Sequence, residues 1–169
     1  ERRDRGETLA YLTGYREFWS LPLRVTPDTL IPRPETELLV ECALALLKQR
    51  ESATVADLGT GSGAIAAAIA CEHPQARLIA TDISAAALAV AESNFQTLQL
   101  HNIELRRGSW MASLKTGERC DLILSNPPYV AEGDPHLQRD GLPWEPVTAL
   151  TSGPDGLGRI RKLNTHAPP

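Results

Sequence analysis

Cysteine and histidine are too few and too scattered in this chain of 169 residues to suggest a disulfide or metal site. There are three cysteines and no Cys-x-x-Cys pair, which argues against a disulfide framework or a zinc site and favours a reducing compartment. We expect the cysteines to be small buried residues and no metal to be bound. The positions concerned are Cys42, Cys71, Cys120, His73, His101, His136 and His166.

Long apolar runs and an excess of positive charge are also missing. No stretch of 18 or more apolar residues occurs, so no transmembrane helix is expected, and residues 1–6 lack the apolar core of a signal peptide. The net charge of −4 weighs against a protein that holds long nucleic acid by its phosphates. We expect a cytoplasmic monomer that binds neither a membrane nor nucleic acid directly. Because the chain does not begin with Met, we also expect it to be part of a longer protein.

Short apolar stretches alternate with helical segments through the middle of the chain. Helices are expected at 64–72 and at 84–98, the second capped by Ser84. This alternation is typical of βαβ units, so we predict an α/β, Rossmann-like fold with a mostly parallel sheet. The predicted strands cover residues 54–58, 77–81, 103–107 and 121–125.

The segments before and after this alternation have a different character. Residues 15–31 alternate like a strand but contain Pro22 and Pro27, which predicts a short edge hairpin or arm. A rigid turn at Pro32–Thr36 then opens an amphipathic helix that reaches about Gln49. One face of that helix is predicted to hold Leu39, Ala43, Leu46 and Leu47.

The region after the last strand, residues 130–158, holds five glycines and four prolines, which predicts a long, partly ordered loop. A helix is expected to start at Arg159–Leu163. Four strands leave few partners for the last one, so at least one further strand is expected outside this chain. We divide the chain into an arm, residues 1–34, and a main domain that is itself incomplete, residues 35–169.

A glycine-rich turn follows the first predicted strand, and Asp82 lies 19 residues beyond its end, at the close of the next strand. Glycines let a ligand approach the backbone closely, and a carboxylate at that second position can accept both ribose hydroxyls of an adenosine. Asp57 suits the ammonium group of S-adenosylmethionine, or the structure of the loop, and would repel a pyrophosphate. S-adenosylmethionine is therefore favoured over a nicotinamide cofactor. The turn consists of Gly59, Thr60, Gly61, Ser62 and Gly63, and the predicted site also includes Asp57 and Leu58 just before it.

Two further sites follow the later strands. Trp110, after the third strand, can cover an adenine ring or act as an ordinary packing aromatic. After the fourth strand comes the run from Asn126 through Pro127 and Pro128 to Tyr129. The Asn126 side-chain oxygen and the Pro127 carbonyl can accept both hydrogens of a planar NH2 group, while the Tyr129 ring packs on it. These acceptors steer the nitrogen lone pair toward a methyl donor and stabilise developing charge, so no strong base is needed.

Taken together, these motifs resemble the HemK/PrmC family of release-factor glutamine N5-methyltransferases. The resemblance rests on Tyr15–Leu23, Ile31–Glu37, Asp57–Ala67 and Ser125–Tyr129. It implies a Rossmann-like methyltransferase fold and methyl transfer from S-adenosylmethionine to the glutamine of the Gly-Gly-Gln motif of class 1 peptide-chain release factors. The resemblance also implies that Gly59–Gly63, Asp82, Trp110 and Asn126 bind the cofactor, that Asn126, Pro127 and Tyr129 act in catalysis, and that Asn126–Tyr129 hold the glutamine.

The chain departs from that family in three ways. Ser109 stands where relatives often have an acidic residue, and the family's N-terminal helical domain and further C-terminal strands are absent. We therefore expect cofactor binding but poor methylation by this chain alone. Arg33 and Glu35 lie in the family's motif and either act near the site or serve the helix start. Three alternatives stay open: a nucleic-acid adenine-N6 or guanine-N2 methyltransferase, a nicotinamide-dependent oxidoreductase, and an inactive or truncated cofactor-binding module.

Overall fold

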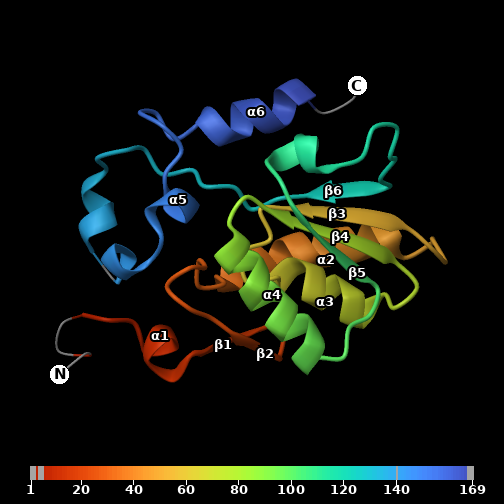
Figure 1. Ribbon diagram of the computed structural model, residues 1–169, viewed down its shortest axis with the longest axis horizontal. Coiled ribbons are helices and arrows are strands. Elements are labelled where there is room, and N and C mark those ends of the chain that lie inside the picture. Colours follow the sequence, from red (N-terminus) through yellow and green to blue (C-terminus); the bar gives the residue numbers. More distant parts are fainter. Residues whose placement is uncertain (1–2, 4–5, 140, 167–169) are drawn as a thin grey trace.

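The computed structural model describes residues 3, 6–139 and 141–166, and its centre is a four-stranded parallel sheet (Figure 1). The strands are β3 (Thr54–Leu58), β4 (Arg77–Asp82), β5 (Ile103–Arg107) and β6 (Leu122–Leu124), in the order β5-β4-β3-β6. The first three match the predicted strands closely, and the fourth is two residues shorter than expected. The predicted Rossmann-like α/β fold is confirmed.

Two helices connect the strands, and both form for reasons visible in the chain. In α3 (Ala64–Glu72) seven consecutive residues are buried, because small side chains let the helix lie close against the sheet. In α4 (Ala85–Thr97) the Ser84 hydroxyl accepts a hydrogen bond from the Ala87 N–H at 3.2 Å, which confirms the predicted cap.

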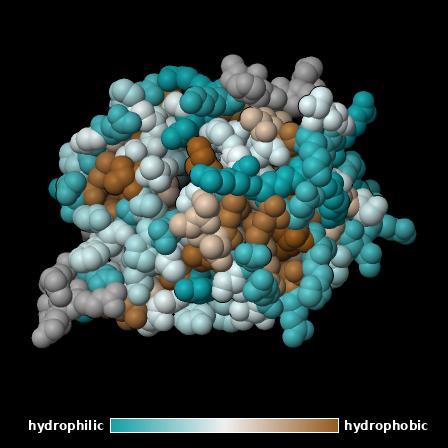
Figure 2. Space-filling model, in the orientation of Figure 1, coloured by the Kyte–Doolittle hydropathy of each residue, from teal (hydrophilic) through white to brown (hydrophobic). Residues whose placement is uncertain are grey.

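The two faces of the sheet are covered differently. Val55, Leu78 and other residues of one face belong to a core shared with α2, α3, α4 and the hairpin. The opposite face, which includes Ile79, packs on Trp110 and on Leu163 of α6 (Gly158–His166). Figure 2 shows apolar side chains gathered over the strands on the side viewed in Figure 1.

The helix before the sheet differs from its prediction. It begins as a 3-10 turn, η2 (Pro34–Thr36), and continues as α2 (Glu37–Leu47), so it ends before Gln49. Its buried face consists of Val40, Ala43 and Leu47, whereas Leu46 is 66% exposed. The assignment of Leu46 to the buried face was wrong, because Leu46 follows Val40 by six positions and so lies about 120° around the helix from it.

The expectation of buried cysteines was also wrong. Cys42 and Cys71 are exposed and Cys120 is intermediate. Cys42 follows Val40 by two positions on α2, which places it on the side of the helix away from the core. Cys71 lies in the last turn of α3, beyond the buried run of that helix.

The N-terminal hairpin is present and packs on the main body. It follows the short helix α1 (Leu9–Thr13) and pairs β1 (Tyr15–Phe18) with β2 (Leu21–Arg24) as a separate antiparallel sheet. Phe18 is buried in the main core, and Asn94 of α4 accepts from the Arg24 N–H at 2.7 Å and donates to the Arg24 carbonyl at 3.0 Å. The hairpin is thus attached beside the glycine-rich turn, because the same Asn94 amide donates to the Ser62 carbonyl at 2.8 Å.

The region predicted as a long loop contains short helical pieces, η4 (Pro135–Gln138), η5 (Leu142–Trp144) and α5 (Val147–Leu150). A parallel bridge joins Val130 to Thr151, so the region folds back on itself. It then meets the arm through buried Glu145, which accepts from the Ile31 N–H at 3.1 Å and forms an ion pair with Arg33.

The helix expected at Arg159–Leu163 is present as part of α6. None of the helices in the described part of the chain is long and apolar enough to cross a membrane. The division at residue 34 and the further strand stay predictions.

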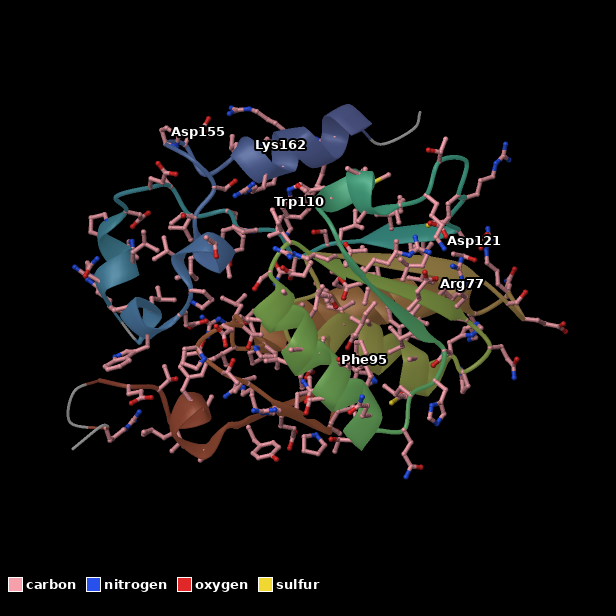
Figure 3. All side chains as sticks on the ribbon, in the orientation of Figure 1. Arg77, Phe95, Trp110, Asp121, Asp155 and Lys162 are labelled. Carbon is pink, nitrogen blue, oxygen red and sulfur yellow. The ribbon has the colours of Figure 1, made fainter. Side chains whose placement is uncertain are left out.

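Gly63 is predicted to be necessary for the packing of α4. Its φ is +83°, and an added Cβ would lie 2.6 Å from the ring of buried Phe95, which lies on α4 (Figure 3). Gly63→Ala should lower the free energy of unfolding by about 3 kcal/mol, measured by urea denaturation. Gly61→Ala is the matched control, because Gly61 has a φ of +56° and no atom within 4 Å of an added Cβ. It should cost only about 1 kcal/mol; equal losses would contradict the role of Phe95.

Candidate functional site

A cavity of about 500 Å³ opens at the edge of the sheet where the parallel strands end. This volume is within the usual range of small-molecule sites. The glycine-rich turn and the residues that follow β4, β5 and β6 form one side of the cavity. Residues 27–30, 32 and 33 of the arm and residues 146, 148 and 149 form the other side.

The glycine-rich turn is attached to the neighbouring strand through its backbone. The N–H groups of Gly59 and Thr60 both donate to the Thr81 carbonyl, at 2.9 and 2.8 Å. Gly59, Gly61 and Gly63 all have positive φ, which explains why glycines occupy these positions. The turn leads directly into α3; Gly59–Ser62 line the cavity, whereas Gly63 is not among its described lining residues.

Asp82 lies in the cavity wall with its carboxylate held on both sides. Oδ2 accepts from the Gly61 N–H at 3.0 Å, and Oδ1 accepts from the Ser84 N–H at 2.9 Å. Each carboxylate oxygen has a second lone pair. Asp82 can therefore accept further hydrogen bonds from hydroxyl groups of a ligand while its own orientation stays fixed.

Asp57 lies beneath the turn and not among the described residues that line the cavity. It is 1% exposed, and its Oδ2 accepts from the Thr60 hydroxyl at 2.6 Å. Burial raises the pKa of Asp57 to about 6, against the lowering effect of the Thr60 hydrogen bond. Of its two predicted roles, this position favours support of the turn.

Trp110 brings an aromatic ring to the same edge of the sheet (Figure 3). An added Cβ at Gly59 would lie 3.5 Å from this ring, so the tryptophan packs over the start of the turn. Its backbone φ of +50° is unusual for a bulky residue and indicates local strain. The ring also contacts the core on one face of the sheet, so it both lines the cavity and packs.

Asn126 and Pro128 line the cavity, whereas Pro127 and Tyr129 are not among its described lining residues. The Asn126 Nδ2 donates to the Thr36 hydroxyl at 3.2 Å. Tyr129 is 66% exposed. The amide of Asn126 is therefore in the wall of the site, and the Tyr129 ring is accessible from solvent.

Ser125 links the strand end before the glycine-rich turn to the strand end before Asn126. Its hydroxyl donates to the Leu58 carbonyl at 2.7 Å. Leu58 immediately precedes the glycine-rich turn, and Ser125 immediately precedes Asn126. The parallel pairing of β3 with β6 ends at Asp57 and Leu124, so this side-chain bond extends the alignment by one residue.

The structure adds residues that the motifs did not single out. Thr36, Thr148 and Arg159 line the cavity, and Glu145 holds Arg33 in its wall. Thr36 lies inside the motif at Ile31–Glu37, which was a usable signal. Nothing in the sequence marked Glu145, because its partners are more than 110 residues away. Glu35 is exposed in the first turn of η2, consistent with a helix-start role.

No group of three or more His, Cys, Asp or Glu side chains that could hold a metal ion occurs within the described residues.

A family model described as the methyltransferase small domain matches residues 34–139, which is more than half of the chain. The chain belongs to the methyltransferase small domain family. The matched residues include the glycine-rich turn, Asp82 and Asn126, so the family assignment covers most of the cavity's strand-end side.

Several longer proteins resemble this methyltransferase small domain along almost its whole length. It is 55% identical over 99% of its length to a release factor glutamine methyltransferase of Xylella fastidiosa, of which it covers 61%. It is 49% identical over 94% of its length to the Escherichia coli protein of the same name, of which it covers 57%. The chain thus spans about three fifths of the curated relatives it matches. Their names agree with the family resemblance inferred from the motifs.

Solved structures support the fold. The hMettl16 catalytic domain, in complexes with two 3′UTR hairpins, aligns with TM-scores of 0.67 and 0.68 at 16% and 17% identity. These alignments cover 87% and 89% of this chain and 56% and 57% of those chains. At such identity the likeness concerns the methyltransferase fold only.

Asp57 should make the stability of the protein depend on pH. Its folded pKa of about 6 lies above the ordinary value of 3.8, so the folded state keeps a proton that the unfolded state has lost between these values. The Asp57 contribution to stability should therefore increase as pH falls through this window. Relative to Asp57→Asn, the free energy of unfolding should rise by about 2 kcal/mol from about pH 7 to about pH 4. Urea denaturation across pH measures this, and a constant difference would refute it.

Proposed function

We propose that this methyltransferase small domain transfers a methyl group from S-adenosylmethionine to the side-chain amide nitrogen of the glutamine in the Gly-Gly-Gln motif of class 1 peptide-chain release factors. The observation that carries the proposal is the Asn126 amide in the cavity wall, whose nitrogen donates to Thr36 and whose oxygen is left as an acceptor. The names of the Xylella fastidiosa and Escherichia coli relatives support the choice of substrate.

The donor half of the site consists of the glycine-rich turn, Asp82 and Trp110. Asp82 accepts the ribose hydroxyls, Trp110 and Ser109 lie against the adenine, and Gly59–Gly63 lets the methionine part approach the backbone. S-adenosylmethionine, when bound, supplies a methyl group activated by a positively charged sulfur. The cavity of about 500 Å³ has room for a ligand of this size.

The acceptor half consists of Asn126–Tyr129. The Asn126 Oδ1 and the Pro127 carbonyl accept the two hydrogens of the glutamine NH2, so its lone pair is directed at the methyl carbon. The carbon–nitrogen bond forms as the carbon–sulfur bond breaks, and the nitrogen then loses a proton to water. Pro128 and the exposed ring of Tyr129 pack against the glutamine side chain. Alignment and fixed dipoles supply the rate enhancement, and no strong base is required.

The remaining parts of the proposal concern organisation. Residues 1–34 act as an arm and residues 35–169 as the catalytic unit, and the arm closes the cavity through Thr29, Leu30, Pro32 and Arg33. The protein acts as a monomer in the cytoplasm, where release factors work, without binding nucleic acid directly.

Asn126→Ala should remove the side-chain oxygen that accepts from the glutamine NH2 group and leave the fold intact. Transfer of radiolabelled methyl groups to purified release factor should fall about 100-fold, because aligned acceptors at the reacting atom are worth a factor of that order. Binding of S-adenosylhomocysteine, measured by calorimetry, should change only a few-fold.

The control substrate is release factor with glutamate in place of the Gly-Gly-Gln glutamine, which has no NH2 group and should accept no label. A wild-type rate of methyl transfer by Asn126→Ala would refute the proposed role of Asn126. Transfer to RNA or DNA, and not to release factor, would refute the proposed substrate.

Asp82→Asn should weaken cofactor binding. The variant keeps the shape of the side chain and one oxygen for the Gly61 N–H, but it loses the negative charge and one acceptor. Affinity for S-adenosylhomocysteine should fall about tenfold by calorimetry, as expected when hydrogen bonds to a charged group are weakened. Tighter binding of NAD than of S-adenosylhomocysteine by the wild-type protein would contradict the choice of cofactor.

A further inference from the structure

Thr36 occupies the position before α2 where a threonine normally caps a helix. Here its side chain makes no capping hydrogen bond, and its backbone is helical, with φ −71° and ψ −18°. The hydroxyl instead accepts from the Nδ2 of Asn126, 90 residues further along the chain, at 3.2 Å. Both residues line the cavity. The usual structural reason for a threonine at this position is therefore missing.

The hydrogen bond with Thr36 restricts the side-chain amide of Asn126. The orientation of this amide decides whether its oxygen or its nitrogen faces the acceptor substrate. Pro127 already limits the Asn126 backbone to extended conformations, but the terminal torsion of an asparagine is broad. With Nδ2 bound to Thr36, the oxygen Oδ1 is directed away from Thr36 and stays available as an acceptor. After a rotation of the amide by half a turn the Thr36 hydroxyl could donate to Oδ1, but Nδ2 would then face the substrate NH2 and two donors would meet, so only the observed orientation suits an acceptor amide.

Thr36 is itself supported by the surrounding structure. Its N–H donates to the Arg33 carbonyl at 3.0 Å, and the Arg33 side chain pairs with buried Glu145. Glu145 also accepts from the Ile31 N–H at 3.1 Å. The segment that carries the Thr36 hydroxyl is thus attached at two points to the buried Glu145 carboxylate. Because this segment is already held in place, the hydroxyl can fix the Asn126 amide.

We propose that Thr36 is a positioning residue for methyl transfer, whose hydroxyl holds the Asn126 amide with its oxygen toward the nitrogen of the acceptor amide. The proposal rests on the proposed function of Asn126. The motif at Ile31–Glu37 would then contribute to methyl transfer through Thr36, which acts only by way of the Asn126 side chain.

The test compares Thr36→Val, which keeps the shape and removes the hydroxyl, with Thr36→Ser, which keeps the hydroxyl. The variants are made in the protein expressed over its whole open reading frame. For Thr36→Val, kcat should fall roughly fivefold, as for the loss of one neutral hydrogen bond, with KM for release factor and affinity for S-adenosylhomocysteine unchanged within about twofold. Thr36→Ser should recover most of the rate.

Two measurements distinguish a positioning role of Thr36 from a purely structural one: the melting temperature and a double-mutant cycle on kcat. Ser84→Ala, which removes a real helix cap, should lower the melting temperature by about 2–4 °C, whereas Thr36→Val should not. On the Asn126→Ala background, Thr36→Val should have no further effect on kcat. The same fivefold loss with and without Asn126 would overturn the proposal.

A measurement without substrate distinguishes this proposal from the proposed function. The side-chain NH2 signals of Asn126, identified in an NMR spectrum by their loss in Asn126→Ala, should move in Thr36→Val and return in Thr36→Ser. If they do not move, the contact is absent in solution and the positioning role is wrong. If they move and the wild-type protein labels no release factor, the contact is real, but the proposed function and the role of Thr36 in it both fail.

Discussion

The parallel pairing of β3 with a strand on each side is the constraint on which the cavity depends. β3 pairs with β4 from Thr54 to Leu58 and with β6 from Val55 to Asp57. Because all these strands run the same way, their carboxyl ends reach the same edge, and the turn after β3 lies between Asp82 and Asn126. The Thr81 carbonyl and the Ser125 hydroxyl then attach that turn to its two neighbours. A shift of one residue in either pairing would separate the two halves of the site.

The other side of the cavity depends on contacts between distant segments. The arm is held to the sheet's helical layer by Asn94, whose amide satisfies both backbone groups of Arg24 and also the Ser62 carbonyl. The region after β6 is held to the arm by buried Glu145. These are buried polar groups with several partners each, and such groups specify one arrangement because any other would leave them unpaired.

Some polar groups of the site support the glycine-rich turn from below, and others keep hydrogen-bond acceptors in the cavity wall. Asp57 is buried beneath the turn, with its pKa raised by burial to about 6, and bonds the Thr60 hydroxyl. Asp82 and Asn126 are held by neighbours yet keep acceptor oxygens in the cavity wall. This division suits a methyl transfer, in which the protein has to align two ligands and supply fixed dipoles, with little proton transfer to manage.

Local sequence was sufficient for the parts of the protein that depend on local physics. Apolar stretches of strand length, glycines at positions of positive φ, Ser84 as a helix cap and prolines after β6 each act within a few residues, and the fold class followed from their order. Leu46 was misplaced because the direction of a helix face is set by what the helix packs against. Thr36 and Glu145 act on the site through contacts with residues 90 or more positions away, Thr36 with Asn126 and Glu145 with Ile31 and Arg33. Only the tertiary structure could decide that the Thr36 hydroxyl serves Asn126 and not its own helix, because both choices satisfy the same local sequence.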